Sequence, residues 1–445
     1  MTTHRIARLL TGLITATITL TACTSTAADQ AVTVNSTAAP SAPPTSAAPT
    51  AESASVTTAP TTPTTPTTPT TPSSTAAAST SKTVIRPAIT VVPADRAAGV
   101  SPTAPILIRA TSGTLDTVSV TNPDGKLVAG SYTDDLTWTS KEPLAYNRQY
   151  RIAATSTTGD GMRPSVESSF TTLKPNQTVY PSFFPNPQMK TVGVGQPLVV
   201  IFDKPPADKA AAERALTVRA TPAVRGSWSW RDNRTVHYRP EKYWAAGTKI
   251  TLSAKVYGVN LGGGMYGETD RTMNLTIGPA KIATIDDATK TMKVYIDSKL
   301  VRTIPVSMGR DQQITAAGKK ISFVTPSGTY VAQEKYAVKQ MSSATYGLPT
   351  TFDLGYDKAI PLAVRLSNGG IFVHSAPWSV ADQGVRNVSH GCININPAAA
   401  KWFYDTFSFG DVVTVTGTST QLAPDDGFGD WNIPWTRWQQ GSASR

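Results

Sequence analysis

Residues 24 to 83 limit what this chain can fold into, because they contain almost nothing but Ala, Thr, Ser, Pro and Val. The triplet Thr-Thr-Pro repeats between Pro60 and Pro72, and a proline at every third position favours an extended polyproline II path. A segment so poor in large apolar side chains cannot build a core. We therefore expect a disordered stalk over 23–83, about 190 Å long if extended at ~3.1 Å per residue or ~45 Å as a flexible coil.

The first 22 residues have the pattern of a secretory signal. Arg5 and Arg8 precede an apolar stretch from Leu9 to Leu20, which is shorter than the roughly 20 residues that a membrane-spanning helix needs. The stretch runs into Leu20-Thr21-Ala22-Cys23, which resembles a bacterial lipobox. We expect a signal peptide over 1–22 and a lipid on Cys23 that anchors the exported protein in the cell membrane, facing the cell wall. An ordinary cleaved signal with an incidental cysteine is the alternative.

Short alternating runs separated by turn signals follow the stalk. Ile106-Leu107-Ile108-Arg109 is one such run, and Asn122-Pro123-Asp124-Gly125 is one such turn signal. Strands of this length and spacing are typical of antiparallel sandwiches. We expect two immunoglobulin-like β-sandwich domains, over 84–174 and 175–279, which serve as spacers or bind glycan.

A third folded segment, over 280–417, is also expected to be rich in strands. Residues 292–306 predict a β-hairpin, 371–373 predict a buried strand that ends at His374, and 398–407 predict a short helix. The expected fold class is therefore mainly β, with two sandwiches followed by a third β-rich domain.

The tail over 418–445 carries Trp431, Trp435 and Trp438. Three large aromatic rings favour burial over exposure. We expect this C-terminal extension to pack on the third domain.

Basic residues outnumber acidic residues by 41 to 30, which gives a formal net charge of +11. An excess of positive charge suits anionic cell-wall polymers or phospholipid headgroups as partners. No run of Lys or Arg concentrates this charge, so nucleic acid is not an expected partner.

Cys392 is the second of two cysteines in the chain, and two of the four histidines lie close to it in sequence. If Cys23 carries lipid, Cys392 has no intramolecular disulfide partner, and a leftover thiol in an exported protein is a candidate for reactivity. A thiol attacks as the thiolate, so it needs a base or a cation within reach. His374 is placed to be that base, and Gly391 lets the backbone approach a developing oxyanion.

Composition and spacing alone leave two other interpretations of these residues open. Cys392 is compatible with a small, inert, buried side chain. His374, His390 and Cys392 are also compatible with a catalytic zinc site, although no carboxylate ligand accompanies them and we expect no metal.

The sequence around Cys392 resembles the signature of L,D-transpeptidases with a YkuD-type catalytic domain. His374 is followed, after 14 intervening residues, by Ser389-His390-Gly391-Cys392-Ile393-Asn394. Further matches lie at Ser307–Gly309, Thr325–Tyr330, Phe372–Trp378 and Gly429–Trp435. The last two resemble the mycobacterial type, which carries immunoglobulin-like domains and often a lipoprotein signal.

The resemblance implies an enzyme that forms 3→3 cross-links in peptidoglycan. In this family the thiolate attacks the carbonyl of diaminopimelate, the third residue of a tetrapeptide stem, and releases the terminal D-Ala. The side-chain amine of diaminopimelate in a second stem then attacks the thioester. The family needs no cofactor and is acylated by carbapenem β-lactams, so stem peptides and carbapenems are the expected partners.

The resemblance also assigns roles to individual residues. Cys392 would be the nucleophile and His374 the general base, oriented by the backbone carbonyl of Ser375. His390 and Gly391 would line the oxyanion side. Asn394 would hold the loop. The residues expected to bind substrate are Tyr356, Met341, Tyr346, Trp378 and Ser389, with Met341 and Tyr346 on a lid; plain core packing is the alternative for these two.

Other functions remain open at this point. An L,D-carboxypeptidase would release D-Ala with water. An NlpC/P60-like endopeptidase has its cysteine before its histidine, the reverse of the order here. A non-catalytic wall-binding lipoprotein would use the two sandwiches as adhesive modules and leave Cys392 unmodified by a carbapenem.

Overall fold

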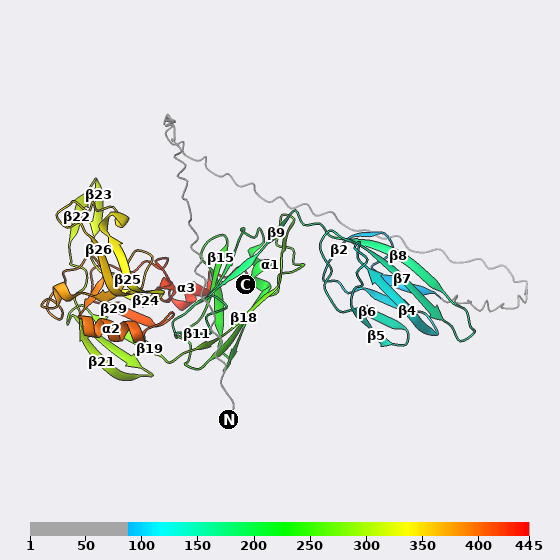
Figure 1. The fold of residues 1–445 in the computed structure, drawn as a ribbon, viewed down its shortest axis with the longest axis horizontal. Helices are drawn as coiled ribbons and strands as arrows, with labels where there is room; N and C mark the ends of the chain where they lie inside the picture. The colour runs from blue at the N-terminus through cyan, green and yellow to red at the C-terminus, as the bar shows by residue number, and fades with distance from the viewer. Residues whose placement is uncertain (1–87, 445) are drawn as a thin grey trace, which may run out of the picture. The chain divides into compact units, whose positions relative to one another are not determined.

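The computed structural model describes residues 88–444, which fold almost entirely into β-strands (Figure 1). The expected signal peptide, the lipid site at Cys23 and the stalk over 23–83 lie outside these residues. No helix within 88–444 is long and apolar enough to cross a membrane. The predicted fold class, mainly β, is confirmed.

The first folded unit is a sandwich of two four-stranded sheets (Figure 1). One sheet has the order β1 (Ile89–Val92), β3 (Leu107–Ala110), β6 (Thr137–Ser140) and β5 (Gly130–Asp134). The other has the order β2 (Ala97–Val100), β8 (Ser165–Thr172), β7 (Gln149–Thr157) and β4 (Thr114–Thr121). Alternate side chains such as Ile108, Trp138, Ile152 and Phe170 fill the space between the sheets, as the period of two in a strand requires.

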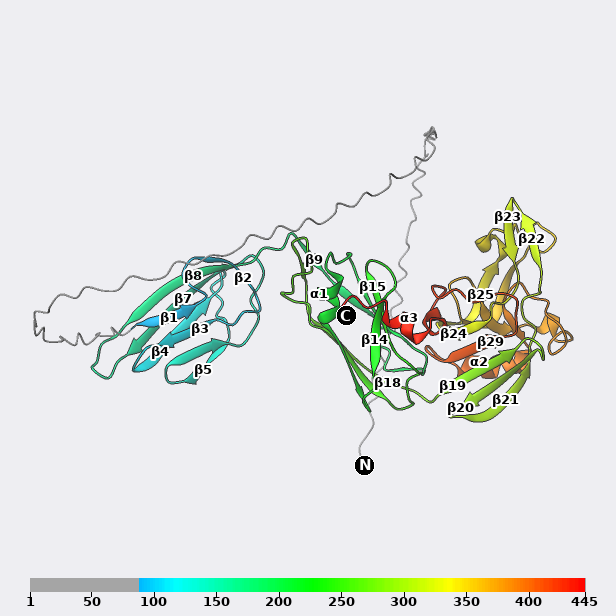
Figure 2. The same ribbon diagram turned by 180° about the vertical axis from the view of Figure 1, so that it is seen from behind.

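The second unit is also a two-layer sandwich, seen from its other side in Figure 2. Its first sheet has the order β10 (Pro181–Phe184), β12 (Leu198–Phe202), β15 (Thr235–Pro240) and β14 (Gly226–Trp230). Its second sheet has the order β11 (Thr191–Val192), β18 (Arg271–Ile277), β16 (Lys249–Ala254) and β13 (Leu216–Thr221). The short pair β9 (Gln177–Val179) and β17 (Met265–Gly267) and the helix α1 (Lys209–Arg214) complete it.

The third unit packs two sheets and one helix around a common core. The five-stranded sheet has the order β21 (Lys299–Pro305), β20 (Thr291–Ile296), β19 (Lys281–Asp286), β29 (Val412–Thr416) and β24 (Gly328–Val331). The four-stranded sheet has the order β25 (Glu334–Ser342), β26 (Asp357–Arg365), β27 (Phe372–Ser375) and β28 (Ile393–Ile395). The helix α2 spans Pro397–Thr406, and Asn396 caps it by accepting a hydrogen bond from the Ala399 N–H.

The predicted elements of this unit are confirmed with small shifts of their bounds. The hairpin expected over 292–306 is β20 and β21, joined by a turn at Asp297 and Ser298, both of which have positive φ. The helix expected over 398–407 begins one residue earlier. The strand expected to end at His374 extends to Ser375.

Two small features cover one end of the four-stranded sheet. The hairpin of β22 (Gln313–Ala316) and β23 (Lys319–Ser322) forms its own small apolar cluster with Phe323 and Leu348. The connection from β25 to β26 begins with the 3₁₀ turn η1 (Ser343–Tyr346).

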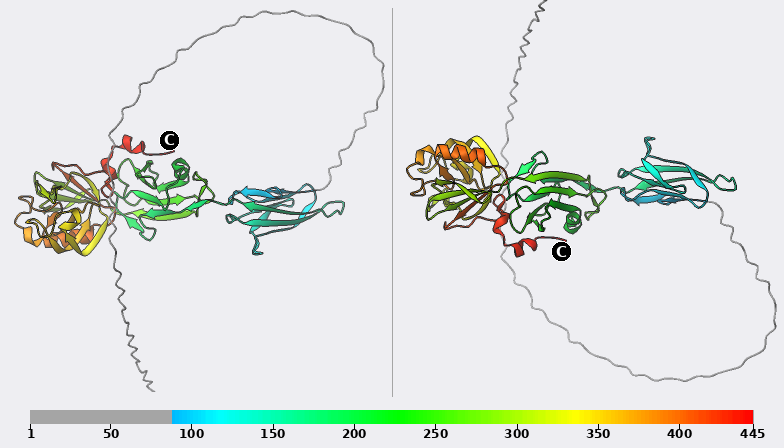
Figure 3. Two further views of the ribbon diagram at one scale, coloured as in Figure 1. Left: turned by 90° about the horizontal axis from the view of Figure 1, so that it is seen from above. Right: turned by 90° about the horizontal axis from the view of Figure 1, so that it is seen from below.

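The tryptophan-rich tail contacts the second sandwich as well as the third unit. The Asn432 side chain accepts a hydrogen bond from the Thr329 N–H on β24 at 2.8 Å and donates one to the Thr329 carbonyl at 2.9 Å. The Trp438 indole donates to the Ser227 carbonyl at 2.9 Å, and the segment lies along the second sandwich in both views of Figure 3. The expectation that the tail packs on the third unit therefore describes only part of its contacts.

Arg239 on β15 is the residue that holds this tail most directly. Its guanidinium lies 4.7, 5.4 and 4.6 Å from the ring centroids of Trp431, Trp435 and Trp438, and it donates to the Ile433 carbonyl at 2.7 Å. Only 2% of Arg239 is exposed, and burial lowers its pKa to about 10, so it keeps its charge at neutral pH. Trp438 is thus buried, and Trp431 and Trp435 half-buried, against a cation, which no local sequence pattern indicates.

We expect Arg239→Met to lower the free energy of unfolding by about 2–4 kcal/mol, because several cation–π contacts and a buried hydrogen bond are lost together. The measurement is guanidinium chloride unfolding followed by tryptophan fluorescence. The exposed Arg234 of the same strand region offers a matched control, Arg234→Met. Equal unfolding midpoints for the two variants would contradict this account of the tail.

Candidate active site

The pairing of β27 with β28 brings the predicted site residues together. The two strands are parallel, with His374 opposite Asn394, and Cys392 immediately precedes β28. Side chains two positions apart in an extended segment point to the same face, so Cys392 and Asn394 share the face on which His374 lies. The residues just before His374 and Asn394, Val373 and Ile393, point into the core, where they are 1% and 0% exposed. The alternation of apolar and polar residues therefore builds the site.

His374 is held in one tautomer by its own strand. Its Nδ1 lies 2.9 Å from the Ser375 carbonyl oxygen, which can only accept a hydrogen bond, so Nδ1 carries the proton and Nε2 has the free lone pair. The ring is almost completely buried, and burial lowers the pKa of His374 to about 4. His374 is therefore a neutral proton acceptor at neutral pH.

Cys392 is a protonated thiol in the same environment. Its Sγ is a donor to the Gly370 carbonyl at 3.5 Å, and its side chain packs on an apolar cluster that includes Met341 and Phe372. Burial raises the pKa of Cys392 to about 11, against a smaller opposite effect of the Phe372 backbone. The resting pair is thus thiol and imidazole, and the proton must move when a substrate is attacked.

Alkylation of Cys392 by iodoacetamide is expected to accelerate about tenfold per pH unit between pH 7 and pH 10. The rate follows the fraction of thiolate, which rises in this way below a pKa of about 11. The check is the pseudo-first-order rate of adduct formation, read by mass spectrometry. A rate that levels off near pH 6 would indicate a preformed thiolate and contradict the neutral resting pair.

The turn before Cys392 is fixed by Ser389. Gly391 has φ +127°, a conformation that favours glycine. The Gly391 N–H donates to Ser389 Oγ at 3.1 Å, and Ser389 Oγ donates to the Cys392 carbonyl at 2.6 Å. The Gly391 N–H is therefore occupied, and the oxyanion role expected of Gly391 does not extend to its own N–H.

Thr325 braces this turn from the other side, and the sequence did not identify it as a site residue. Its Oγ1 donates to the Gly391 carbonyl at 2.7 Å and accepts from the Gly309 N–H at 2.8 Å. A Cβ on Gly309 would collide with the Phe323 carbonyl, so only glycine fits there. The matches at Ser307–Gly309 and Thr325–Tyr330 thus correspond to supports of the cysteine turn.

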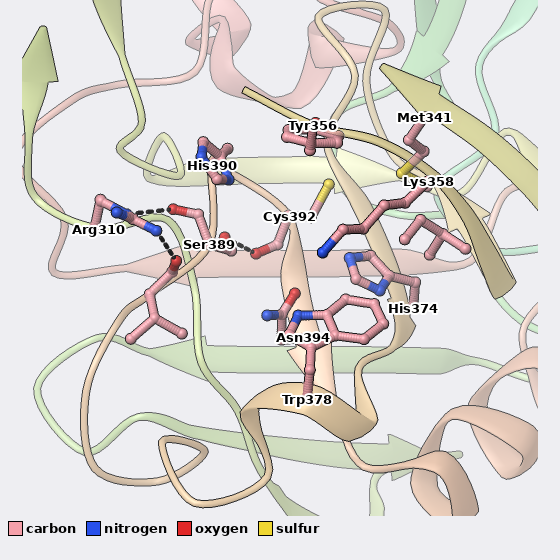
Figure 4. Close-up of a pocket in the computed structure, with 12 residues that line it drawn as sticks. Arg310, Met341, Tyr356, Lys358, His374, Trp378, Ser389, His390, Cys392 and Asn394 are labelled. Carbon is pink, nitrogen blue, oxygen red and sulfur yellow. Dashed lines mark hydrogen bonds between the residues drawn. The ribbon is translucent and has the colours of Figure 1, made fainter. Parts of the chain in front are cut away.

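Two cavities meet at Cys392. The first has a volume of about 240 Å³ and includes His374, Asn394 and Trp378 in its wall (Figure 4). The second has a volume of about 420 Å³ and includes Tyr346 and Gly370 in its wall. Both share the side chains of Met341, Tyr356, His390 and Cys392.

The residues expected on the lid and rim line these cavities. Met341 is 9% exposed at the end of β25, and the Tyr346 ring lies 6.3 Å from the Tyr356 ring. Trp378 is 54% exposed, and its ring lies 6.0 Å from the His374 ring at an angle of 29°. Trp378 therefore covers one side of His374 while its outer face remains open to solvent.

Two buried polar atoms in the wall of the first cavity have no hydrogen-bond partner within the part of the chain that the structure describes. They are His390 Nε2 and Asn394 Oδ1. Burial and the nearby Arg310 lower the pKa of His390 to about 4, so His390 is uncharged at neutral pH. Asn394 donates its amide to Ser379 Oγ at 3.0 Å, which ties β28 to the loop after β27. A bound substrate that offers polar groups would satisfy both atoms.

The first cavity also contains two cations that the sequence did not identify, Arg310 and Lys358. Arg310 directly follows the match at Ser307–Gly309, which is a signal that could have found it. Lys358 lies on β26, outside every motif, and only the pairing of strands brings it to the cavity.

The zinc interpretation is not supported by the geometry of the described residues. Within 88–444 no group of three or more His, Cys, Asp or Glu side chains is arranged to hold a metal ion. His374, His390 and Cys392 line one cavity without forming a ligand set.

Comparison with known families agrees with this fold and site. Residues 97–260 match the bacterial Ig domain family, and residues 280–415 match the L,D-transpeptidase catalytic domain of the YkuD type. The class of protein is therefore a chain with immunoglobulin-like domains before a YkuD catalytic domain.

Individual relatives extend the match over most of the chain. L,D-transpeptidase 2 of Mycobacterium tuberculosis (strain CDC 1551 / Oshkosh) is 40% identical over 359 residues, which cover 80% of this chain and 85% of the relative. L,D-transpeptidase 5 of Mycobacterium tuberculosis (strain ATCC 25618 / H37Rv) is 36% identical over 366 residues, which cover 80% and 77%. A solved structure of LD transpeptidase LdtMt1 in complex with imipenem has 31% identity and a TM-score of 0.44, and covers 53% of this chain and 97% of that chain. The chain belongs to the L,D-transpeptidase family and is an L,D-transpeptidase enzyme.

Proposed function

We propose that this L,D-transpeptidase forms 3→3 cross-links between peptidoglycan stems through a thioester on Cys392. The observation that carries the proposal is the shared face of β27 and β28, which sets a thiol and an imidazole with a free Nε2 in one cavity wall. A neutral pair of this kind, with the histidine buried and the cysteine half-buried, suits acyl transfer, because a base must take the thiol proton as the sulfur attacks.

In the first half-reaction Cys392 Sγ attacks the carbonyl carbon of diaminopimelate in a tetrapeptide stem, and the thiol proton passes to His374 Nε2. The negative charge on the carbonyl oxygen is stabilised by the Cys392 N–H and the Tyr356 hydroxyl. The C–N bond then breaks, the proton on His374 passes to the departing nitrogen, and D-Ala leaves. The stem is left as a thioester on sulfur.

In the second half-reaction the side-chain amine of diaminopimelate in another stem attacks the thioester. The C–N bond forms, the C–S bond breaks, and the proton from the amine passes through His374 to the sulfur. The amine that leaves and the amine that enters both exchange a proton with the same Nε2. We therefore assign both amines to the first cavity, beside His374, and the body of the acyl donor to the second cavity.

The walls of the site favour an amine over water. Met341 and Tyr356 lie above Cys392 in Figure 4, and with Phe372 and Ile360 they belong to the apolar cluster against which its side chain packs. Exclusion of water protects a thioester from hydrolysis and strengthens the polar contacts that remain. This favours transpeptidation over L,D-carboxypeptidase activity.

The test is incubation of the purified enzyme with disaccharide-tetrapeptide, followed by mass spectrometry of the products. We expect a cross-linked dimer and free D-Ala. Tripeptide and D-Ala without any dimer would instead indicate hydrolysis. A parallel incubation with a carbapenem is expected to add one drug mass to the chain at Cys392, because the β-lactam carbonyl meets the same thiol. An unmodified chain would favour a non-catalytic wall-binding protein.

Membrane attachment through Cys23 is part of the same proposal. The lipobox-like segment would anchor the enzyme on the outer face of the cell membrane, and the stalk would let it reach toward the wall. Intact-mass analysis of the mature protein is expected to show a diacylglyceryl group on Cys23, and its absence would remove the anchor.

A further inference from the structure

Lys358 lines the first cavity and, within the part of the chain that the structure describes, has no ion-pair partner. It lies on β26, its side chain is exposed, and its ammonium nitrogen is 5.9 Å from the centroid of the Trp378 ring. Among residues 88–444 it belongs to none of the ion pairs. In Figure 4 the Lys358 side chain extends into the cavity toward His374.

The cavity offers no negative charge to balance this lysine. None of the 12 residues in its wall is Asp or Glu, and the second cation, Arg310, is already engaged in hydrogen bonds with backbone carbonyls. Arg310 donates to the carbonyls of Val388 and Ser389 at 2.5 and 3.4 Å, and it lies over the Phe323 ring. Arg310 therefore holds the turn before Cys392, whereas Lys358 is free to meet a ligand.

The two amines that use this cavity in the proposed reaction have the same local chemistry. The nitrogen of the departing D-Ala is bonded to a carbon that carries a carboxyl group. The side-chain nitrogen of diaminopimelate is also bonded to a carbon that carries a carboxyl group, which is either free or amidated. A free carboxylate beside the transferring nitrogen would therefore face the rim of the cavity during both half-reactions.

We propose that the Lys358 ammonium group binds this carboxylate, so that Lys358 selects acceptor stems whose side-chain carboxyl of diaminopimelate is free over stems in which it is amidated. The inference rests on the proposed 3→3 transpeptidation and adds a specificity-determining residue to it. A carboxylate and an ammonium form a charge-assisted hydrogen bond, which an amide cannot equal. Lys358 and His374 both lie beside the Trp378 ring. In this proposal Lys358 meets the carboxylate while His374 exchanges a proton with the neighbouring nitrogen.

The experiment is a competition between two acceptors for one acyl-enzyme. The donor is a disaccharide-tetrapeptide. The acceptors are two disaccharide-tripeptides, present at equal concentration, that differ only in amidation of the side-chain carboxyl of diaminopimelate and lack the D-Ala needed to act as donors. Mass spectrometry gives the ratio of the two cross-linked products. The result is the change in this ratio between variants, since amidation also alters the basicity of the neighbouring amine.

We expect Lys358→Gln to lower the ratio of free to amidated product by about tenfold, in line with loss of one charge-assisted hydrogen bond. Lys358→Arg is expected to keep most of the preference. The preference of the native enzyme is expected to fall with added salt, which screens an exposed charge, while the ratio of Lys358→Gln stays constant. Lys320→Gln, which removes an exposed charge from β23, is the matched control and is expected to leave the ratio unchanged.

The outcomes separate the two proposals. If Lys358→Gln still forms dimers with the ratio of the native enzyme, or loses both products equally, Lys358 does not read the carboxylate and the 3→3 activity stands. If the native enzyme forms no dimer from any acceptor, the proposed function fails, and the role of Lys358 fails with it.

Discussion

Cys392→Ala is expected to abolish dimer formation and carbapenem acylation together, with a loss of roughly 10⁵- to 10⁶-fold or more, because removal of the nucleophile removes the covalent intermediate. The measurement is the initial rate of D-Ala release from disaccharide-tetrapeptide, with the adduct mass as a second readout. Cys392 is the free thiol of the described part of the chain, so no neighbouring sulfur can take its place there.

Cys392→Ser is the matched variant for this test. It keeps the size of the side chain, so the cluster of Met341, Phe372 and Tyr356 stays packed, but a hydroxyl is far harder to ionise than a thiol beside the same histidine. We expect it to fold with an unchanged thermal midpoint and to be almost as inactive as Cys392→Ala. Substantial activity in either folded variant would end the thioester mechanism.

His374→Asn is expected to slow acylation by about 10²- to 10⁴-fold, the usual contribution of a general base. The asparagine amide can still donate to the Ser375 carbonyl, as Nδ1 does at 2.9 Å, so the strand remains supported while the proton acceptor is lost. His390→Asn provides a comparison within the same cavity. It should cost much less, because no contact of the described residues holds His390 Nε2 in place as a base.

The pH dependence identifies the base independently of the size of this loss. Burial lowers the pKa of His374 to about 4, so the native enzyme should keep its acylation rate from pH 8 down to about pH 5 and lose it only as the pH falls through 4. In His374→Asn the rate should instead rise with pH, because it depends on the small fraction of free thiolate below a pKa of about 11. A native profile that falls near pH 6.5 would contradict a buried neutral His374.

Local patterns were sufficient to predict several elements of the molecule. The hairpin at β20 and β21 and the capped helix α2 follow from short-range rules of alternation, turns and caps. The tail shows where such rules stop. Its tryptophans signal burial, but the partner that receives them is Arg239, nearly two hundred residues earlier in the chain. Only the packing of two separate units creates that environment.

The features of the active site also divide into those that the sequence predicts and those that depend on the tertiary structure. The spacing of His374 and Cys392 was visible in the sequence, since both lie in one signature. The neutral state of the pair was not visible, because it depends on how completely surrounding segments exclude water from both groups. The supporting role of Thr325 and the occupied N–H of Gly391 likewise depend on contacts across many residues of sequence.

By itself, the sequence determined the mainly β fold class, the family and the two residues on which the proposed chemistry depends, because alternation, turn residues and a compact motif are properties of neighbours along the chain. The tertiary structure alone decided the protonation state of the pair, the meeting of two cavities at Cys392 and the position of Lys358 at the rim. Each of these results from burial or from strand pairing between distant segments, and such distances in space are not encoded in any short stretch of residues.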